Sequence, residues 1–154
     1  MIQVAAATPL VALNLLATSI WAGGLVAIFV VARVAAATLE PAQRIAFFRG
    51  LGRAYGIIGS AALLLALVTG AILLAGHPWD GLLVAALLLA GALLVFTVAG
   101  MAQARAMSRL RSQALTTPDL ADRVGREARV AAGLRGAIAA FTLALLVVGA
   151  ALAQ

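Results

Sequence analysis

The sequence predicts an all-α polytopic membrane protein, a bundle of four transmembrane helices that extend beyond the bilayer on the cytoplasmic side. Of the 154 residues, 65% are hydrophobic and only 10% are charged, which is too little polar surface for a soluble domain of this size. The apolar residues form runs long enough to cross a hydrocarbon core of about 30 Å. We therefore expect a single membrane domain over residues 1–154.

The first transmembrane helix is expected at residues 10–33, an apolar run that carries no charge before Arg33. Within it, Asn14, Thr18 and Trp21 recur at intervals that place an amide, a hydroxyl and an indole on one face of a helix. This polar stripe is the most specific feature of the chain.

The second helix follows a short break at which Thr38 or Glu40 can cap a helix and Pro41 suits the first helical turn. The connection 34–53 is rich in arginine and amphipathic, and residues 54–76 form the second span. Such a segment rests in the headgroup region of a membrane. We expect lipid headgroups to be contacted by the arginines that flank the spans, namely Arg44, Arg49, Arg53 and Arg135.

Two roles are open for the polar stripe of the first helix. In one, its polar side chains donate hydrogen bonds to Ser60 or to a backbone carbonyl of a neighbouring helix, and a strip of small residues that includes Gly56, Ser60 and Gly70 lets the helices approach closely. In the other, the stripe is the wall of an intramembrane pocket for a lipid, quinone or porphyrin-like ligand. The ligand-binding residues would then be Asn14, Thr18, Trp21 and Ser60.

The third and fourth spans are expected at residues 82–101 and 136–153. A polar turn precedes the third span, and its Trp79 suits the membrane interface. The arginine-rich connection 102–135 is interpreted as two helical extensions joined by a turn, because Thr116–Asp119 is typical of a helix start and a long structureless loop is uncommon in so small a domain.

Residues capable of chemistry are few. The chain has one histidine and no cysteine, and no Asp or Glu lies within a span, which argues against proton relays and ion-coupled transport. His77 is the one candidate metal ligand, in the turn before the third span. The sequence therefore predicts no catalytic residues and no cofactor, and it favours a non-enzymatic binding or accessory protein.

The arginines predict orientation and partners. The chain has 11 basic residues, all of them arginine, and they flank the first and third connections, whereas the His77 turn and both termini lack them. The positive-inside rule then places both arginine-rich connections in the cytoplasm and both termini outside the inner membrane. The expected partners are membrane lipids, a second copy, or a cytoplasmic protein docked on the arginines near Arg126; this clustering beside spans argues against nucleic acid.

The segment from Asn14 to Trp21, followed by Ala-Gly-Gly, resembles the first-helix signature of the copper-resistance D (CopD) domain, the HemJ-type protoporphyrinogen oxidases and related small membrane proteins. The pattern Phe48-Arg49-x-Leu51-Gly52-Arg53, with Val68-Thr69-Gly70 later in the helix, resembles their second helix. The resemblance covers about the first half of the chain and implies a helical bundle with copper handling or haem-linked redox chemistry. Where the family has a histidine, this chain has Asn14, whose amide ligates either metal poorly.

We predict the following topology from the arginine distribution. Single cysteines introduced at Ala5, Gly81 and Ala153 of this cysteine-free chain should react with a membrane-impermeant maleimide added to intact cells, whereas cysteines at Gln43 and Ser112 should not. Permeabilised cells provide the control for reactivity, and labelling of Ser112 in intact cells would contradict the orientation.

Overall fold

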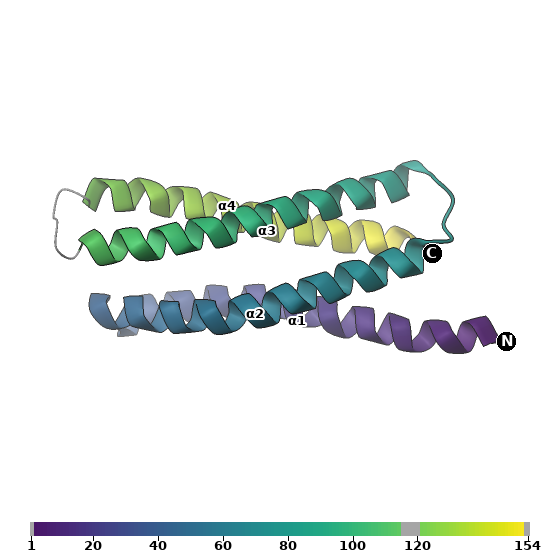
Figure 1. Ribbon diagram of the computed structural model, residues 1–154, viewed down its shortest axis with the longest axis horizontal. Coiled ribbons are helices and arrows are strands. Elements are labelled where there is room, and N and C mark those ends of the chain that lie inside the picture. The colour runs from purple at the N-terminus through teal and green to yellow at the C-terminus, as the bar shows by residue number, and fades with distance from the viewer. Residues whose placement is uncertain (1, 115–120, 153–154) are drawn as a thin grey trace. The chain divides into compact units, whose positions relative to one another are not determined.

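The computed structural model of the chain is all-α, as predicted, and it describes residues 2–114 and 121–152. Within these residues there are four long helices: α1 (Ile2–Thr38), α2 (Pro41–Leu74), α3 (Gly81–Ala114) and α4 (Ala121–Leu152) (Figure 1). Each helix contains a stretch that is long and apolar enough to cross a membrane. The chain is therefore a multi-pass membrane protein, and α2 ends at Leu74, two residues before the end of its predicted span.

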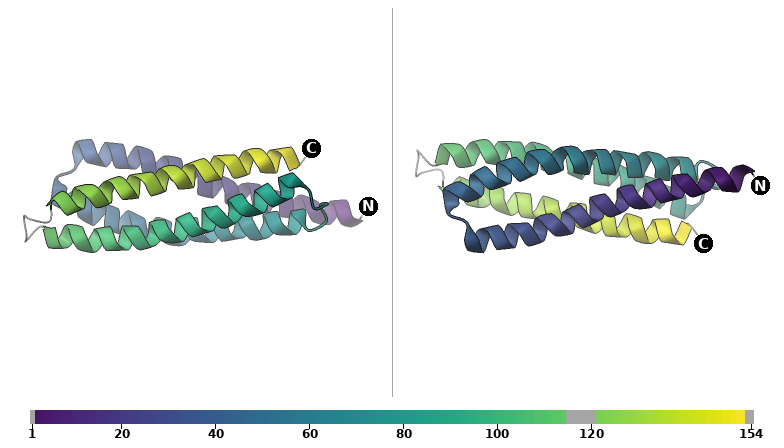
Figure 2. Two further views of the ribbon diagram at one scale, coloured as in Figure 1. Left: turned by 90° about the horizontal axis from the view of Figure 1, so that it is seen from above. Right: turned by 90° about the horizontal axis from the view of Figure 1, so that it is seen from below.

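The helices form two hairpins. Helix α1 packs against α2 in one compact unit, Met1–Pro78, and α3 packs against α4 in the other, Trp79–Gln154 (Figures 1 and 2). Consecutive helices joined by short connections pack antiparallel, since a parallel pair would need a long crossover.

The break between α1 and α2 is built from local hydrogen bonds. The Thr38 hydroxyl donates to the Val34 carbonyl at 2.8 Å and so belongs to the last turn of α1. Glu40 is the N-cap of α2, and its backbone N–H donates to the Gln43 side-chain oxygen at 3.3 Å. Pro41 then occupies the first turn, where its missing N–H costs nothing. Of the two capping residues that the sequence offers, the structure uses Glu40.

The turn between α2 and α3 uses a cap that the sequence analysis did not single out. Asp80 accepts a hydrogen bond from the Leu83 backbone N–H at 2.8 Å on its Oδ1 atom, which satisfies one of the first N–H groups of α3. His77 lies in the same turn and donates its backbone N–H to the Leu74 carbonyl at 2.9 Å. The Trp79 side chain is 80% exposed.

Burial within the helices follows a heptad pattern. Buried and half-buried residues of α1 recur every three or four positions, and α3 repeats this spacing. A period of 3.5 residues is typical of helices that cross at a shallow, left-handed angle. The opposite surfaces carry exposed apolar side chains, for example Ile57 and Leu88, which in a membrane face lipid. The positions that show the period are Asn14, Ala17, Trp21, Gly24, Ile28, Val31 and Ala35 on α1, and Leu83, Ala86, Ala90, Leu93, Thr97 and Gly100 on α3.

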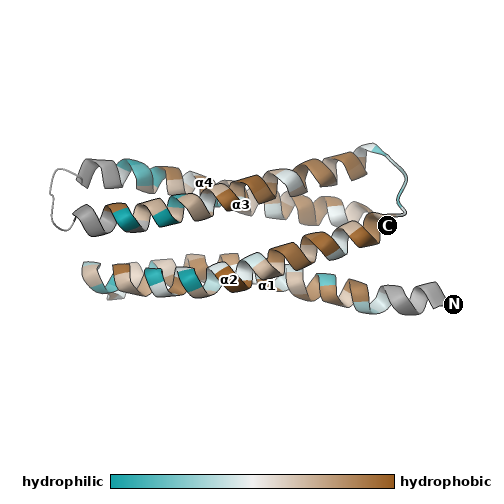
Figure 3. Ribbon diagram, viewed as in Figure 1, coloured by the Kyte–Doolittle hydropathy of each residue, from teal (hydrophilic) through white to brown (hydrophobic). Residues whose placement is uncertain are grey.

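The connection 102–135 is helical over residues 102–114 and again over residues 121–135. Helix α3 continues to Ala114 and α4 begins at Ala121, so the predicted turn at Thr116–Asp119 lies outside the described residues. Gln103 on α3 donates a hydrogen bond from Nε2 to Oε2 of Glu127 on α4 at 2.6 Å, which joins the two extensions. Figure 3 shows apolar α3 giving way to hydrophilic residues toward its C-terminal end. We call the helical extensions 102–114 and 121–135 the stalk.

Candidate functional site

The Asn14 side chain joins α1 to α2 inside the membrane. Its Nδ2 atom donates to the backbone carbonyl of Ala66 and to the hydroxyl of Thr69, each at 2.8 Å. A carboxamide nitrogen carries two hydrogens, so both donors of Asn14 are engaged. The Thr69 hydroxyl passes its own hydrogen to the Leu65 carbonyl at 2.7 Å. The result is a short chain of hydrogen bonds at a position where lipid offers no partners.

Tyr55 provides a second link between the same helices, roughly two helical turns further along α1. Its hydroxyl donates to the Trp21 carbonyl at 3.0 Å. The ring occupies the space beside Gly24, because a Cβ atom added to Gly24 would overlap it. The ring also crosses Gly59 of its own helix, where an added Cβ would lie 2.9 Å from Cε1 of Tyr55. Any side chain at Gly24 would thus displace the tyrosine.

The three residues of the predicted stripe on α1 therefore have different surroundings. Trp21 is buried, with 6% of its surface exposed, and its backbone carbonyl accepts the Tyr55 bond. Asn14 is half-buried and hydrogen-bonded to α2. Thr18 is also half-buried but takes part in neither interhelical link. The Thr18 hydroxyl is thus the polar group of the stripe that takes part in neither of these two interhelical links.

Ser60 does not join this arrangement as a partner of Asn14. Its hydroxyl donates to the Gly56 carbonyl of its own helix at 2.6 Å. Of the two acceptors that the sequence offered to Asn14, the structure uses the backbone carbonyl, at Ala66. Serine readily bonds the carbonyl four residues earlier in a helix.

The sequence analysis missed Tyr55, Gly59 and Thr69. It chose Gly56, Ser60 and Gly70 as the contact strip, one position away along the helix, and only Gly70 lies close to Asn14, at 3.5 Å from an added Cβ to Nδ2. A shift of one residue turns a helix face by about 100°. The available signal was Tyr55 itself, the one tyrosine of the chain, placed within an apolar span.

The second hairpin has a different interior. The ring centroids of Phe96 and Phe141 are 5.1 Å apart, and the Thr142 hydroxyl donates to the Ile138 carbonyl at 2.8 Å. The hydroxyl of Thr97 is buried and has no hydrogen-bond partner in the described part of the chain, which costs stability. The Phe96–Phe141 contact thus joins α3 to α4 within the spans.

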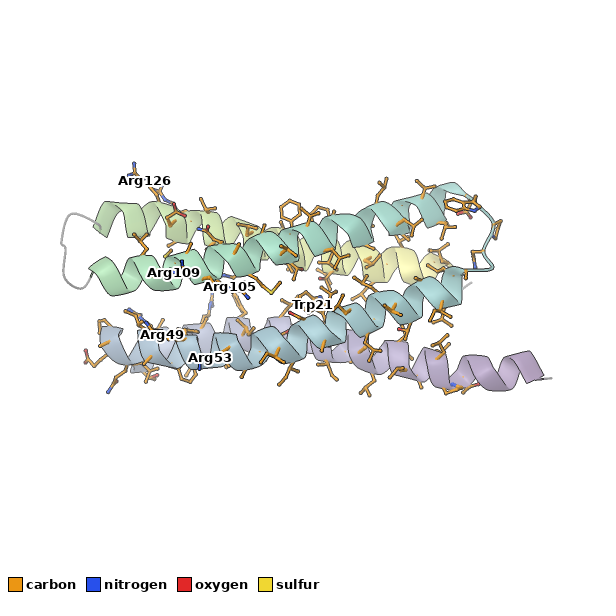
Figure 4. All side chains as sticks on the ribbon, in the orientation of Figure 1. Trp21, Arg49, Arg53, Arg105, Arg109 and Arg126 are labelled. Carbon is orange, nitrogen blue, oxygen red and sulfur yellow. The ribbon has the colours of Figure 1, made fainter. Side chains whose placement is uncertain are left out.

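The arginines predicted to meet headgroups differ in exposure. Arg49 and Arg53 are exposed on the N-terminal part of α2 (Figure 4). Arg135 is exposed on α4. Arg44 is half-buried. On α1, the Arg33 guanidinium carbon lies 5.0 Å from the centroid of the Phe29 ring, a cation–π distance.

The remaining candidate was His77 as a metal ligand. Among the described residues, no three His, Cys, Asp or Glu side chains come together in a way that could hold a metal ion. His77 is half-buried beside Pro78 in the turn after α2. A single imidazole needs further ligands to hold a metal ion.

Comparison of the chain with protein-family models, with curated proteins and with solved structures finds no match.

We predict that the two polar links stabilise the first hairpin unequally. Asn14→Ala removes two hydrogen bonds and should lower the free energy of unfolding by about 1–2 kcal/mol, since such bonds contribute about 0.6 kcal/mol each and at most about 1.7 kcal/mol. Tyr55→Phe removes one bond and keeps the ring, so its effect should be smaller. Unfolding equilibria in bicelles would measure both.

Ser19→Ala is the matched control, because Ser19 is an exposed hydroxyl residue on the same helix. Equal stability of Asn14→Ala and Ser19→Ala would contradict the role of Asn14 as an interhelical link.

Proposed function

We propose that the chain is a non-enzymatic accessory protein of the bacterial inner membrane, with both termini outside, that docks an acidic cytoplasmic protein on its stalk. The observation that carries this proposal is the Gln103–Glu127 hydrogen bond at 2.6 Å, which joins α3 to α4 beyond the apolar spans. It holds the arginine-bearing helices at a fixed separation. Charged side chains that are held in a fixed arrangement before binding favour a specific partner.

The charge of the stalk indicates the chemistry of its partner. Seven arginines and three acidic residues occur between residues 102 and 135. Among the described ones, Arg105, Arg126 and Arg129 are exposed, while Glu127 is engaged by Gln103. Figure 4 shows Arg126 directed away from α3. A surface that carries this excess of positive charge complements an acidic protein surface.

The apolar side chains of the stalk argue for a soluble partner. Among its described side chains, Val130 is the only large apolar one that is exposed, at 53%. An interfacial helix would instead present a broad apolar face to the lipid. The stalk therefore suits water and a protein surface better than the bilayer.

Haem or copper chemistry, which the resemblance to CopD-domain and HemJ-type proteins implies, does not fit the residues of this chain. The position of the family histidine is Asn14, an amide whose nitrogen already donates two hydrogen bonds to α2. An amide in that state offers neither the imidazole donor that binds haem iron nor a soft ligand for copper.

A second candidate function is the binding of an amphiphilic small molecule beside Thr18. The observation that favours it is the position of this half-buried hydroxyl between Asn14 and Trp21, outside both interhelical links. An apolar wall with few polar anchors is how hydrophobic ligands are bound.

We predict that the docking of a partner depends on the stalk arginines. A partner protein retained by the purified full chain should be lost on Arg126→Gln with Arg129→Gln, and also at high salt, because screening weakens exposed charge pairs. The matched control is Arg49→Gln with Arg53→Gln in the other hairpin, which should keep the partner. Equal retention by the stalk variant and the wild type would contradict the proposal.

The second candidate makes its own prediction. If a ligand binds at Thr18, mass spectrometry of small molecules extracted from the purified protein should detect a compound that is depleted in Thr18→Val, which removes a hydroxyl at nearly constant volume. Ser19→Ala should leave the compound in place. The same compounds in equal amounts from all three proteins would contradict this candidate.

A further inference from the structure

The arginine-bearing end of the first hairpin exposes more apolar surface than the stalk does. On α1, Val26, Phe29, Val30 and Val34 are each more than half exposed. On α2, Phe47 is 42% exposed and lies between arginines in the sequence. An exposed apolar surface interleaved with arginine is typical of a segment that lies at the membrane interface.

The length of α1 places this surface at the edge of the bilayer. Its apolar stretch, Thr8–Thr38, has 31 residues, and a helix of this length spans about 46 Å, against a hydrocarbon core of about 30 Å. The excess must be covered by the interfacial layer or by tilt. Because Tyr55 bonds the Trp21 carbonyl, the part of α1 beyond Trp21 lies alongside the part of α2 before Tyr55. Val26 therefore lies near the depth of Arg49, and Val30 and Val34 lie farther from the membrane centre.

Arg49 and Arg53 are the two guanidinium groups best placed for a phosphate. They are one helical turn apart on α2, so they project from the same face, and both are exposed. Residues 54–74 of α2 span about 31 Å, which puts Arg53 at the hydrocarbon boundary and Arg49 about 6 Å beyond it. This is the level of lipid phosphates.

No acidic residue lies close to the pair in the sequence. Added Cβ atoms at Gly52 and Gly56 would meet nothing within 4 Å. Glu40, the nearest acid in sequence, is at the N-cap of α2, where its backbone N–H binds Gln43. Guanidinium groups bind phosphate through paired N–H donors.

We propose that Arg49 and Arg53 bind the phosphate of an anionic phospholipid of the phosphatidylglycerol type. The pair favours an anionic lipid over a zwitterionic one because two positive charges without an acidic neighbour complement a headgroup of net negative charge. This site belongs to the first hairpin and does not depend on the proposed docking of a protein by the stalk.

The experiment uses the full chain, delipidated in detergent and offered phosphatidylglycerol or phosphatidylcholine of identical acyl chains, with retained lipid counted by native mass spectrometry. The wild type should retain phosphatidylglycerol in preference to phosphatidylcholine. Arg49→Gln with Arg53→Gln should weaken retention of phosphatidylglycerol by roughly thirtyfold, in line with the loss of two juxtamembrane charges. Inorganic phosphate at millimolar concentration should not compete, since it lacks the acyl chains.

Arg105→Gln with Arg109→Gln is the matched control, a pair with the same spacing beyond the third span, and it should leave retention unchanged. Equal loss in both double variants, equal retention of the two lipids by the wild type, or displacement by inorganic phosphate would overturn the proposal.

A second measurement covers the case in which the Arg49 and Arg53 variant does not fold. Phosphatidylglycerol with a photoreactive headgroup, added to the wild-type protein in nanodiscs, should crosslink to the peptide that contains residues 45–53. Crosslinks confined to other segments would overturn the assignment.

Discussion

The structure depends on one constraint, the absence of hydrogen-bond partners in the hydrocarbon core. Each backbone N–H and C=O there must be paired within the protein, which leaves the continuous helix as the available conformation for these spans. The same constraint acts on side chains. Asn14, Thr69 and Tyr55 carry polar groups within the membrane spans. Asn14 donates a hydrogen bond to the Thr69 hydroxyl, and Tyr55 donates one to the Trp21 carbonyl. Their bonds set which residues of α1 and α2 meet.

The two hairpins use different means to fix their helices. In α1–α2, polar links combine with a close contact at Gly24, where the Tyr55 ring takes the place of a side chain. In α3–α4, apolar packing such as the Phe96–Phe141 pair holds the spans, and the Gln103–Glu127 bond lies beyond them. Directional bonds within lipid make the register of the first hairpin more specific, because a shifted register would leave Asn14 unpaired.

The arginine-bearing ends differ in the surface that surrounds the charge. Around Arg49 and Arg53 there are exposed valines and phenylalanines, whereas the described part of the stalk exposes Val130 as its one large apolar side chain. Charge beside apolar surface suits a lipid interface, and charge beside polar surface suits water. The two proposals, an anionic lipid on α2 and an acidic protein on the stalk, follow from this difference.

The sequence by itself determined the four helices, because apolar run length and the Pro41 break are local properties that lipid enforces. It also identified Asn14 as a polar residue that needs a partner. Only the tertiary structure decided the partner, since the choice between Ser60 and Ala66 with Thr69 depends on the rotation of α2 about its axis. Small residues occur on several faces of α2, so their pattern alone could not select that rotation. The Tyr55 ring against Gly24 selects it, through a contact between residues distant in the sequence.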